Sequence, residues 1–242
     1  MMNKFLLRLP LFYSVITILI VIISWLGNYY GFDIRNILSA EGLRWFVENL
    51  IPNMALSPLA EIVFLLMAIS VVVESGLLKV FSGNLSPKQR RALQLTGALF
   101  LFYCLLLVVL VFFSSSILLS ALGTISGSPL SRGVLGLIVI SLLMIGNFYG
   151  FVSGRLVTVN DFIQAHCELI RKISPFFITI IIASQLVAFV DYAFGDGFPV
   201  NLELLSFFVY YVPLFLHLAC GVKRELLFPI YLKFFILVKR PR

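Results

Sequence analysis

The sequence has few charged residues. Asp, Glu, Lys and Arg make up 12% of its 242 residues, whereas apolar residues make up 61%. Soluble domains contain about 25% charged residues, and a soluble fold of this length has too little interior to bury so much apolar surface. The many Leu, Ile, Val and Phe residues also exclude an intrinsically disordered chain. The mean hydropathy of +1.07 therefore predicts that lipid surrounds most of the chain.

Cysteine and histidine are also scarce. Cys104, Cys167 and Cys220 are widely separated and form no paired framework, which excludes a secreted disulfide scaffold. His166 and His217 belong to no metal-binding motif, and the sequence contains no H-E-x-x-H, C-x-x-C or P-loop pattern. We therefore expect no metal site, no organic cofactor and no enzymatic activity.

Six apolar runs are long enough to cross a bilayer, which takes about 20 helical residues. They cover residues 11–30, 56–73, 92–113, 134–151, 173–190 and 204–221. A seventh run at 226–238 has 13 residues and contains Pro229 and Lys233, so we expect a short re-entrant or interfacial C-terminal segment. The pattern predicts an all-α membrane protein that forms a single integral membrane domain over residues 1–242.

Two further segments, 39–50 and 160–172, alternate apolar and polar residues with helical spacing. We expect both to be amphipathic helices in the membrane interface, although they are equally well interpreted as plain connectors. Ser39 is the predicted start of the first helix and Pro52 its stop. Asn160 or Asp161 is the predicted cap of the second.

Lys and Arg residues are distributed asymmetrically about the six runs. Fifteen fall on the side of the N-terminus and three, Arg35, Arg44 and Arg132, fall on the other. Because cytoplasmic loops retain basic residues, both termini are predicted to be cytoplasmic. The net charge of +7 is thus explained by topology and by attraction to anionic lipid, and it requires no nucleic-acid partner.

Polar residues within membrane spans are candidate functional sites. The candidates for binding a substrate or ion are Ser114, Ser115, Ser116, Asn147 and Gln185, each with interhelical hydrogen bonding as the structural alternative. The serines open a Gly/Ser-rich stretch, 112–133, that is typical either of a broken helix at a carrier's binding site or of an outer loop. Their neutral oxygens would suit Na⁺ as a coupling ion.

One pattern in the sequence is compatible with an enzyme. Gly123 to Gly127 and His217 are similar to the serine–histidine dyad of rhomboid-like intramembrane proteases, with Ser126 as the nucleophile. A nucleophile must lie within hydrogen-bond reach of its base. The predicted topology places Ser126 at the outer face and His217 about 20 Å deeper, at 1.5 Å per helical residue. A protease is therefore a distant third interpretation.

Several segments together resemble the AbgT (p-aminobenzoyl-glutamate) transporter family. The early ones are Ser39–Trp45 (SAEGLRW) and Glu74–Leu78 (ESGLL), and the later ones are Tyr149-Gly150, Asp161 in the second amphipathic segment and Ser184–Phe189 (SQLVAF). Residues 1–85 resemble the early part of the family, residues 134–225 resemble its later half, and residues 86–133 diverge. The chain is about half as long as family members, and it lacks their polar hairpin motifs.

The resemblance implies a bacterial inner-membrane protein that is a homodimer or part of a larger complex. It also implies an ion-coupled carrier for aromatic acid conjugates. Two interpretations follow. The chain is either a shortened carrier that builds its pathway by assembling with other chains, or a non-transporting subunit or scaffold of a multiprotein membrane complex.

Overall fold

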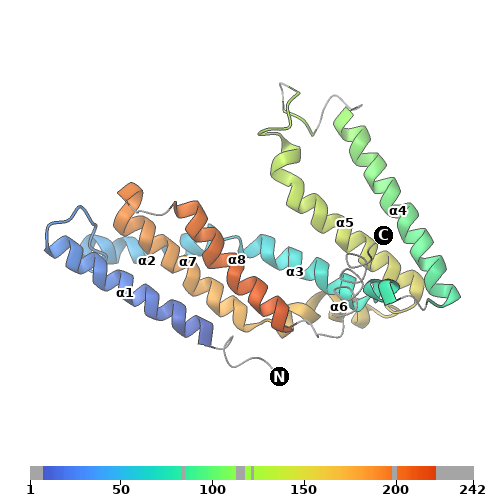
Figure 1. Ribbon diagram of the computed structural model, residues 1–242, viewed down its shortest axis with the longest axis horizontal. Coiled ribbons are helices and arrows are strands. Elements are labelled where there is room, and N and C mark those ends of the chain that lie inside the picture. Colours follow the sequence, from blue (N-terminus) through green and yellow to red (C-terminus); the bar gives the residue numbers. More distant parts are fainter. Residues whose placement is uncertain (1–7, 83–84, 113–117, 121–122, 198–200, 222–242) are drawn as a thin grey trace, which may run out of the picture. The chain divides into compact units, whose positions relative to one another are not determined.

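The computed structural model describes residues 8–82, 85–112, 118–120, 123–197 and 201–221 (Figure 1). Over these residues the chain is helical and contains no β-strand. The helices are α1 (Leu9–Tyr29), α2 (Ala40–Ala55), α3 (Leu59–Glu74), α4 (Pro87–Phe112), α5 (Pro129–Ser153), α6 (Val159–Lys172), α7 (Pro175–Phe194) and α8 (Leu202–Gly221), with 3₁₀ turns η2 (Leu77–Ser82) and η3 (Gly195–Gly197).

The described helices confirm an all-α membrane protein. Five stretches are long and apolar enough to cross a bilayer, namely Leu9–Tyr29, Ala40–Glu74, Pro87–Phe112, Pro129–Ser153 and Pro175–Phe194. The second of these contains both α2 and α3. The sixth predicted span corresponds to a shorter apolar helix, Leu202–Leu218 within α8. The predicted C-terminal segment, 226–238, lies outside the described residues.

Both amphipathic segments are helices, but two predicted boundaries are wrong. Pro52 does not end α2, which continues to Ala55 with Pro52 inside it. A proline lacks the N–H that would bond the carbonyl four residues earlier, and here that loss is confined to the last turn of α2. The second helix is capped by Thr158, whose hydroxyl accepts from the Asp161 amide at 3.1 Å. The Asp161 carboxylate in turn accepts from the Thr158 amide at 2.9 Å, so the two residues form a reciprocal capping box.

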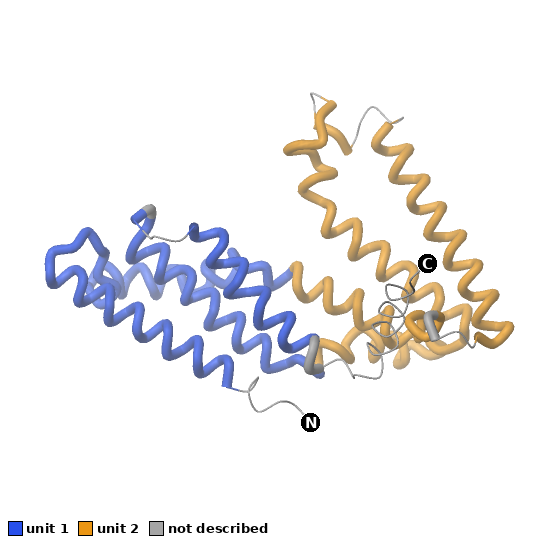
Figure 2. Tube along the Cα trace, in the orientation of Figure 1, with its two compact units in different colours: residues 1–60, 172–222 blue, residues 61–171, 223–242 orange. Residues whose placement is uncertain are grey.

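The first of two compact units comprises residues 1–60 and 172–222 (Figure 2). Helix α7 is its centre and packs against α1, α2 and α8. The connection between α1 and α2 is held to α7, because the Arg35 amide donates to the Ala193 carbonyl at 2.9 Å. The α2 residue Trp45 stacks on Tyr192 with ring centroids 4.2 Å apart. Helix α2 therefore packs on a neighbouring helix through its aromatic side.

The second unit comprises residues 61–171 together with 223–242 (Figure 2). Helices α4 and α5 pack along one another, and the Tyr103 hydroxyl of α4 donates to the Leu137 carbonyl of α5 at 3.0 Å. Within α4 the buried residues are Ala92 and Thr96, so most of its apolar surface is open to lipid. Helix α3 contacts α6 through Ser70, and the Arg155 side chain after α5 bonds the Glu74 carbonyl at the end of α3.

Candidate functional site

The predicted site residue Gln185 is buried in α7, and both ends of its amide are occupied. Its Nε2 donates to the Leu50 carbonyl of α2 at 3.0 Å, and its Oε1 accepts from Nδ2 of Asn53 at 3.2 Å. Asn53 is 7% exposed and Gln185 9% exposed. The Gln185 side chain thus joins α7 to the last turns of α2. Sequence reasoning missed Asn53, because it ended the helix at Pro52 and left Asn53 outside.

The predicted site residue Asn147 lies in α5 and faces His166 of α6. Its Nδ2 is 3.4 Å from His166 Nε2, and the other ring nitrogen, Nδ1, donates to the Phe162 carbonyl at 2.8 Å. Asn147 Oδ1 is buried and has no hydrogen-bond partner among the described residues. Sequence reasoning considered His166 only as a metal ligand and did not pair it with Asn147, since nothing in the spacing showed that α6 returns to α5.

Asn147 belongs to a Gly146–Gly150 stretch that lets α5 approach α3 closely. A Cβ on Gly146 would lie 2.9 Å from Val71 Cγ1 and 3.1 Å from the Val72 backbone nitrogen. A Cβ on Gly150 would lie 3.3 Å from Ser75 Cβ. Small residues four apart allow such contact between membrane helices, so Gly146 and Gly150 let α5 pack directly against α3.

In the second unit, Ser70 of α3 is hydrogen-bonded to α6. Its hydroxyl donates to the Ala165 carbonyl at 2.6 Å and accepts from the Leu169 amide at 3.1 Å. Ala165 and Leu169 are four residues apart, so the hydroxyl lies between the two groups that a helical hydrogen bond would join. Sequence reasoning missed Ser70, a single serine in an otherwise apolar run.

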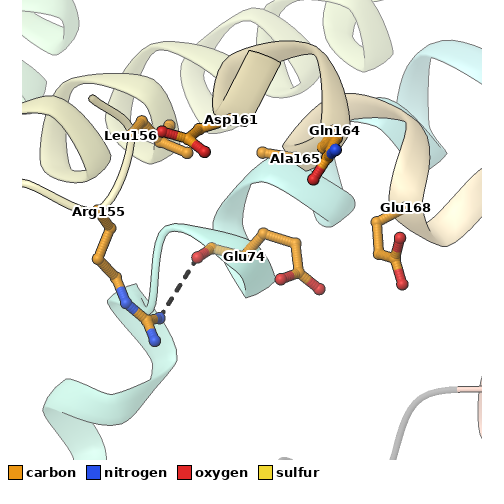
Figure 3. Close-up of a pocket in the computed structure, with 7 residues that line it drawn as sticks. All are labelled: Glu74, Arg155, Leu156, Asp161, Gln164, Ala165 and Glu168. Carbon is orange, nitrogen blue, oxygen red and sulfur yellow. Dashed lines mark hydrogen bonds between the residues drawn. The ribbon is translucent and has the colours of Figure 1, made fainter. Parts of the chain in front are cut away.

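A cavity of about 270 Å³ lies beside these contacts, at the C-terminal ends of α3 and α5 (Figure 3). Its lining residues are Glu74, Arg155, Leu156, Asp161, Gln164, Ala165 and Glu168. The Arg155 guanidinium donates to the Glu74 carbonyl at 3.3 Å and so places positive charge at the C-terminus of α3. Hydrogen bonds from the Thr158 and Val157 amides lower the pKa of the Asp161 carboxyl.

The serine-rich candidates are only partly described. Ser114, Ser115 and Ser116 lie outside the described residues. The described residues that follow, 118–120 and 123–128, form turns, and the hydroxyls of Ser120 and Thr124 are 2.7 Å apart in an exposed position. These described residues agree with the loop alternative for the stretch.

The protease interpretation gains no support from the two residues it needs. Ser126 lies in an exposed turn before α5. His217 is buried in α8, and its Nδ1 donates to the Pro213 carbonyl of the same helix at 2.7 Å. A serine nucleophile would instead be hydrogen-bonded to its histidine base.

The described polar contacts within the spans hold helices to one another. Gln185 joins α7 to α2, Ser70 joins α3 to α6, and Asn147 joins α5 to α6. Gln185 lies in the first unit and Asn147 in the second. These residues therefore support the interhelical alternative stated for them.

Residues 78–196, from η2 to the start of η3, match the AbgT putative transporter family. This stretch is AbgT-like. The predicted resemblance to the family is confirmed, over just under half of the chain. Neither the curated proteins nor the solved structures contain a match. The AbgT-like stretch and the five long apolar helices make the chain a multi-pass, transporter-like membrane protein.

Proposed function

We propose that the protein is an AbgT-type carrier of a bacterial inner membrane that transports aromatic acid conjugates after assembling with further chains. The observation that carries this proposal is the family match over residues 78–196, which covers α4, α5, α6 and α7. The asymmetry of Lys and Arg supports cytoplasmic termini. Na⁺ is the proposed coupling ion, because the polar groups within the spans are mainly neutral.

Assembly is part of the proposal, because two described polar side chains within the spans, Gln185 and Ser70, are engaged between helices. Both ends of the Gln185 amide are hydrogen-bonded to α2, and a carrier needs polar groups that face its substrate. A second copy, in a homodimer, is the partner that the family resemblance favours.

The same observation favours a second candidate function. A chain whose polar groups within the spans hold its own helices together has the properties of a framework. It could serve as a non-transporting membrane subunit of a multiprotein complex. The two candidates differ in whether the purified chain moves solute by itself and in what copurifies with it.

The test begins with purification from native membranes in mild detergent. Recovery of a homodimer supports the carrier, whereas a stoichiometric foreign protein supports the subunit. The purified protein is then reconstituted in vesicles, and flux of a labelled aminobenzoyl conjugate is measured with and without a Na⁺ gradient. Gradient-dependent flux by the homo-oligomer is expected. Absence of flux from a well-folded homo-oligomer, over a series of aromatic acid conjugates, would contradict the proposed carrier.

A further inference from the structure

The start of α4 carries three exposed basic side chains, Lys88, Arg90 and Arg91, which form the basic turn. Within the described residues, none of the three side chains forms a hydrogen bond or an ion pair. They do not stabilise the helix that carries them, because the helix dipole favours acidic residues in the first turn, and α4 has none there. The packing of α4 therefore gives no reason for this concentration of positive charge.

The basic turn lies beside the end of α5. Helices α4 and α5 pack along one another, and the start of α4 meets the end of α5 (Figure 1). A Cβ on Gly154, the residue that follows α5, would overlap Nζ of Lys88. The next residue is Arg155, which is also exposed. Positive charge from the ends of two neighbouring helices thus gathers in the second unit.

The acidic side chains near Arg155 are engaged elsewhere. Asp161 accepts from two backbone amides at the start of its own helix, and Glu168 forms an ion pair with Arg171. Both line the cavity described above, together with Glu74. We therefore expect an anion from outside the chain to neutralise the basic turn.

An exposed apolar stripe begins at the basic turn. Leu95, Phe102 and Leu105 follow Arg91 by 4, 11 and 14 residues, a spacing that places all four residues on one face of a helix. The three apolar side chains are 43%, 62% and 61% exposed. In a bilayer this face contacts acyl chains, and Arg91 lies where the apolar part of α4 begins. A ligand that covers both parts has an anionic group joined to hydrocarbon.

We propose that the basic turn binds the headgroup of one anionic phospholipid, whose acyl chains lie along the face of α4 that carries Arg91 and Leu95. The asymmetry of Lys and Arg predicts that this end of α4 is cytoplasmic. Basic clusters at the cytoplasmic ends of membrane helices suit anionic headgroups by charge. Lys88 lies against the end of α5, so the site includes the contact between two helices and differs from a general attraction to the membrane surface.

The experiment is native mass spectrometry of the full chain in a neutral detergent. The protein is titrated with phosphatidylglycerol or with phosphatidylcholine that has the same acyl chains, and the first bound lipid is counted. We expect the first phosphatidylglycerol to bind at least about tenfold more tightly than the first phosphatidylcholine, because several cations contact its headgroup. Equal affinity for the two lipids would overturn the proposal.

Single substitutions locate the site. Lys88→Gln and Arg91→Gln should each weaken binding of phosphatidylglycerol about fivefold, which corresponds to about 1 kcal/mol for one basic residue, and leave phosphatidylcholine unaffected. Arg8→Gln is the matched control, because Arg8 is an exposed cation at the start of another lipid-exposed helix, α1. An equal loss in Arg8→Gln, or no loss in the two variants of the basic turn, would overturn the proposal.

A competition with glycerol 3-phosphate separates a lipid from a soluble phosphate ester. The lipid proposal requires that this compound, at the same concentration, leaves phosphatidylglycerol bound, because it has no acyl chain to contact Leu95. Displacement of the lipid by glycerol 3-phosphate would assign the basic turn to a soluble anion and overturn the proposal. These readouts do not involve transport, so they are independent of whether the proposed carrier function is correct.

Discussion

Replacement of Gln185 by Leu tests whether this amide holds helices together or binds a solute. In the structure it joins α7 to α2 through the Leu50 carbonyl at 3.0 Å and Asn53 at 3.2 Å. Interhelical hydrogen bonds in membrane proteins contribute on average about 0.6 and at most about 1.7 kcal/mol each. Gln185→Leu breaks two of them and leaves the Asn53 amide buried without a partner, which costs about 1–3 kcal/mol. We expect a loss of about 2–4 kcal/mol of unfolding free energy.

The double-mutant cycle with Asn53→Leu makes this test specific. Asn53→Leu alone should cost less, about 1–2 kcal/mol, because Gln185 keeps its bond to Leu50. The double variant places two apolar side chains opposite each other. Replacing both partners of a buried hydrogen bond by apolar groups of similar shape can leave the unfolding free energy nearly unchanged. We therefore expect the double variant to be more stable than Gln185→Leu alone, with a coupling of at least about 1 kcal/mol.

The assay is equilibrium unfolding of the purified chain in mixed micelles of a mild and a denaturing detergent, followed by circular dichroism. Ser141→Ala is the control, since its hydroxyl bonds its own helix. If Gln185→Leu unfolds at the same detergent fraction as the parent chain and the two substitutions add without coupling, the interhelical assignment is refuted. Loss of solute flux at unchanged stability would instead assign Gln185 to binding.

Four further predictions concern the second unit and the topology. Ser70→Ala should cost about 1–2 kcal/mol in the same unfolding assay, because two buried backbone groups of α6 lose their partner; a neutral effect would contradict that contact. Gly146→Leu should destabilise by about 1–3 kcal/mol or more through overpacking against α3, whereas an unchanged stability would mean that the helices do not approach so closely. The pKa of Asp161 is lowered in the folded chain, so its contribution is present above the unfolded value and is lost as the pH falls through the folded value. Hydrogen-exchange protection of α6 should therefore decline on acidification, and Asp161→Ala should abolish that decline. In a cysteine-free background, single cysteines at Ser86 and Gly197 should react with an impermeant reagent from opposite sides; labelling from the same side would contradict the predicted topology.

Most of the fold could be predicted from local sequence, because apolar run length and helical spacing are local properties. The run at 92–113 predicted the body of α4, and the spacing at 160–172 predicted α6 to within a residue at its start. The errors were at helix ends. Pro52 was given too much weight because a proline in the last turn removes only one bond, and Thr158 was missed as a cap because Asn160 and Asp161 are equally good candidates by residue type.

The candidate site could be predicted only in part, because its contacts join residues far apart in sequence. Gln185 and Asn147 stand out as polar residues in apolar runs, and both are in polar contacts in the structure. Their partners Asn53 and His166 depend on how helices return to one another, which periodicity within one helix does not specify. Ser70 shows the same limit, since serines in apolar helices commonly bond their own backbone whereas this one bonds α6.

The two described candidate residues differ in how completely their amides are bonded. Gln185 has both ends of its amide bonded to α2, whereas Asn147 has one contact to His166 and a buried oxygen without a hydrogen-bond partner among the described residues. An unsatisfied buried acceptor is unfavourable, so the structure assigns Gln185 to holding helices together more fully than it does Asn147.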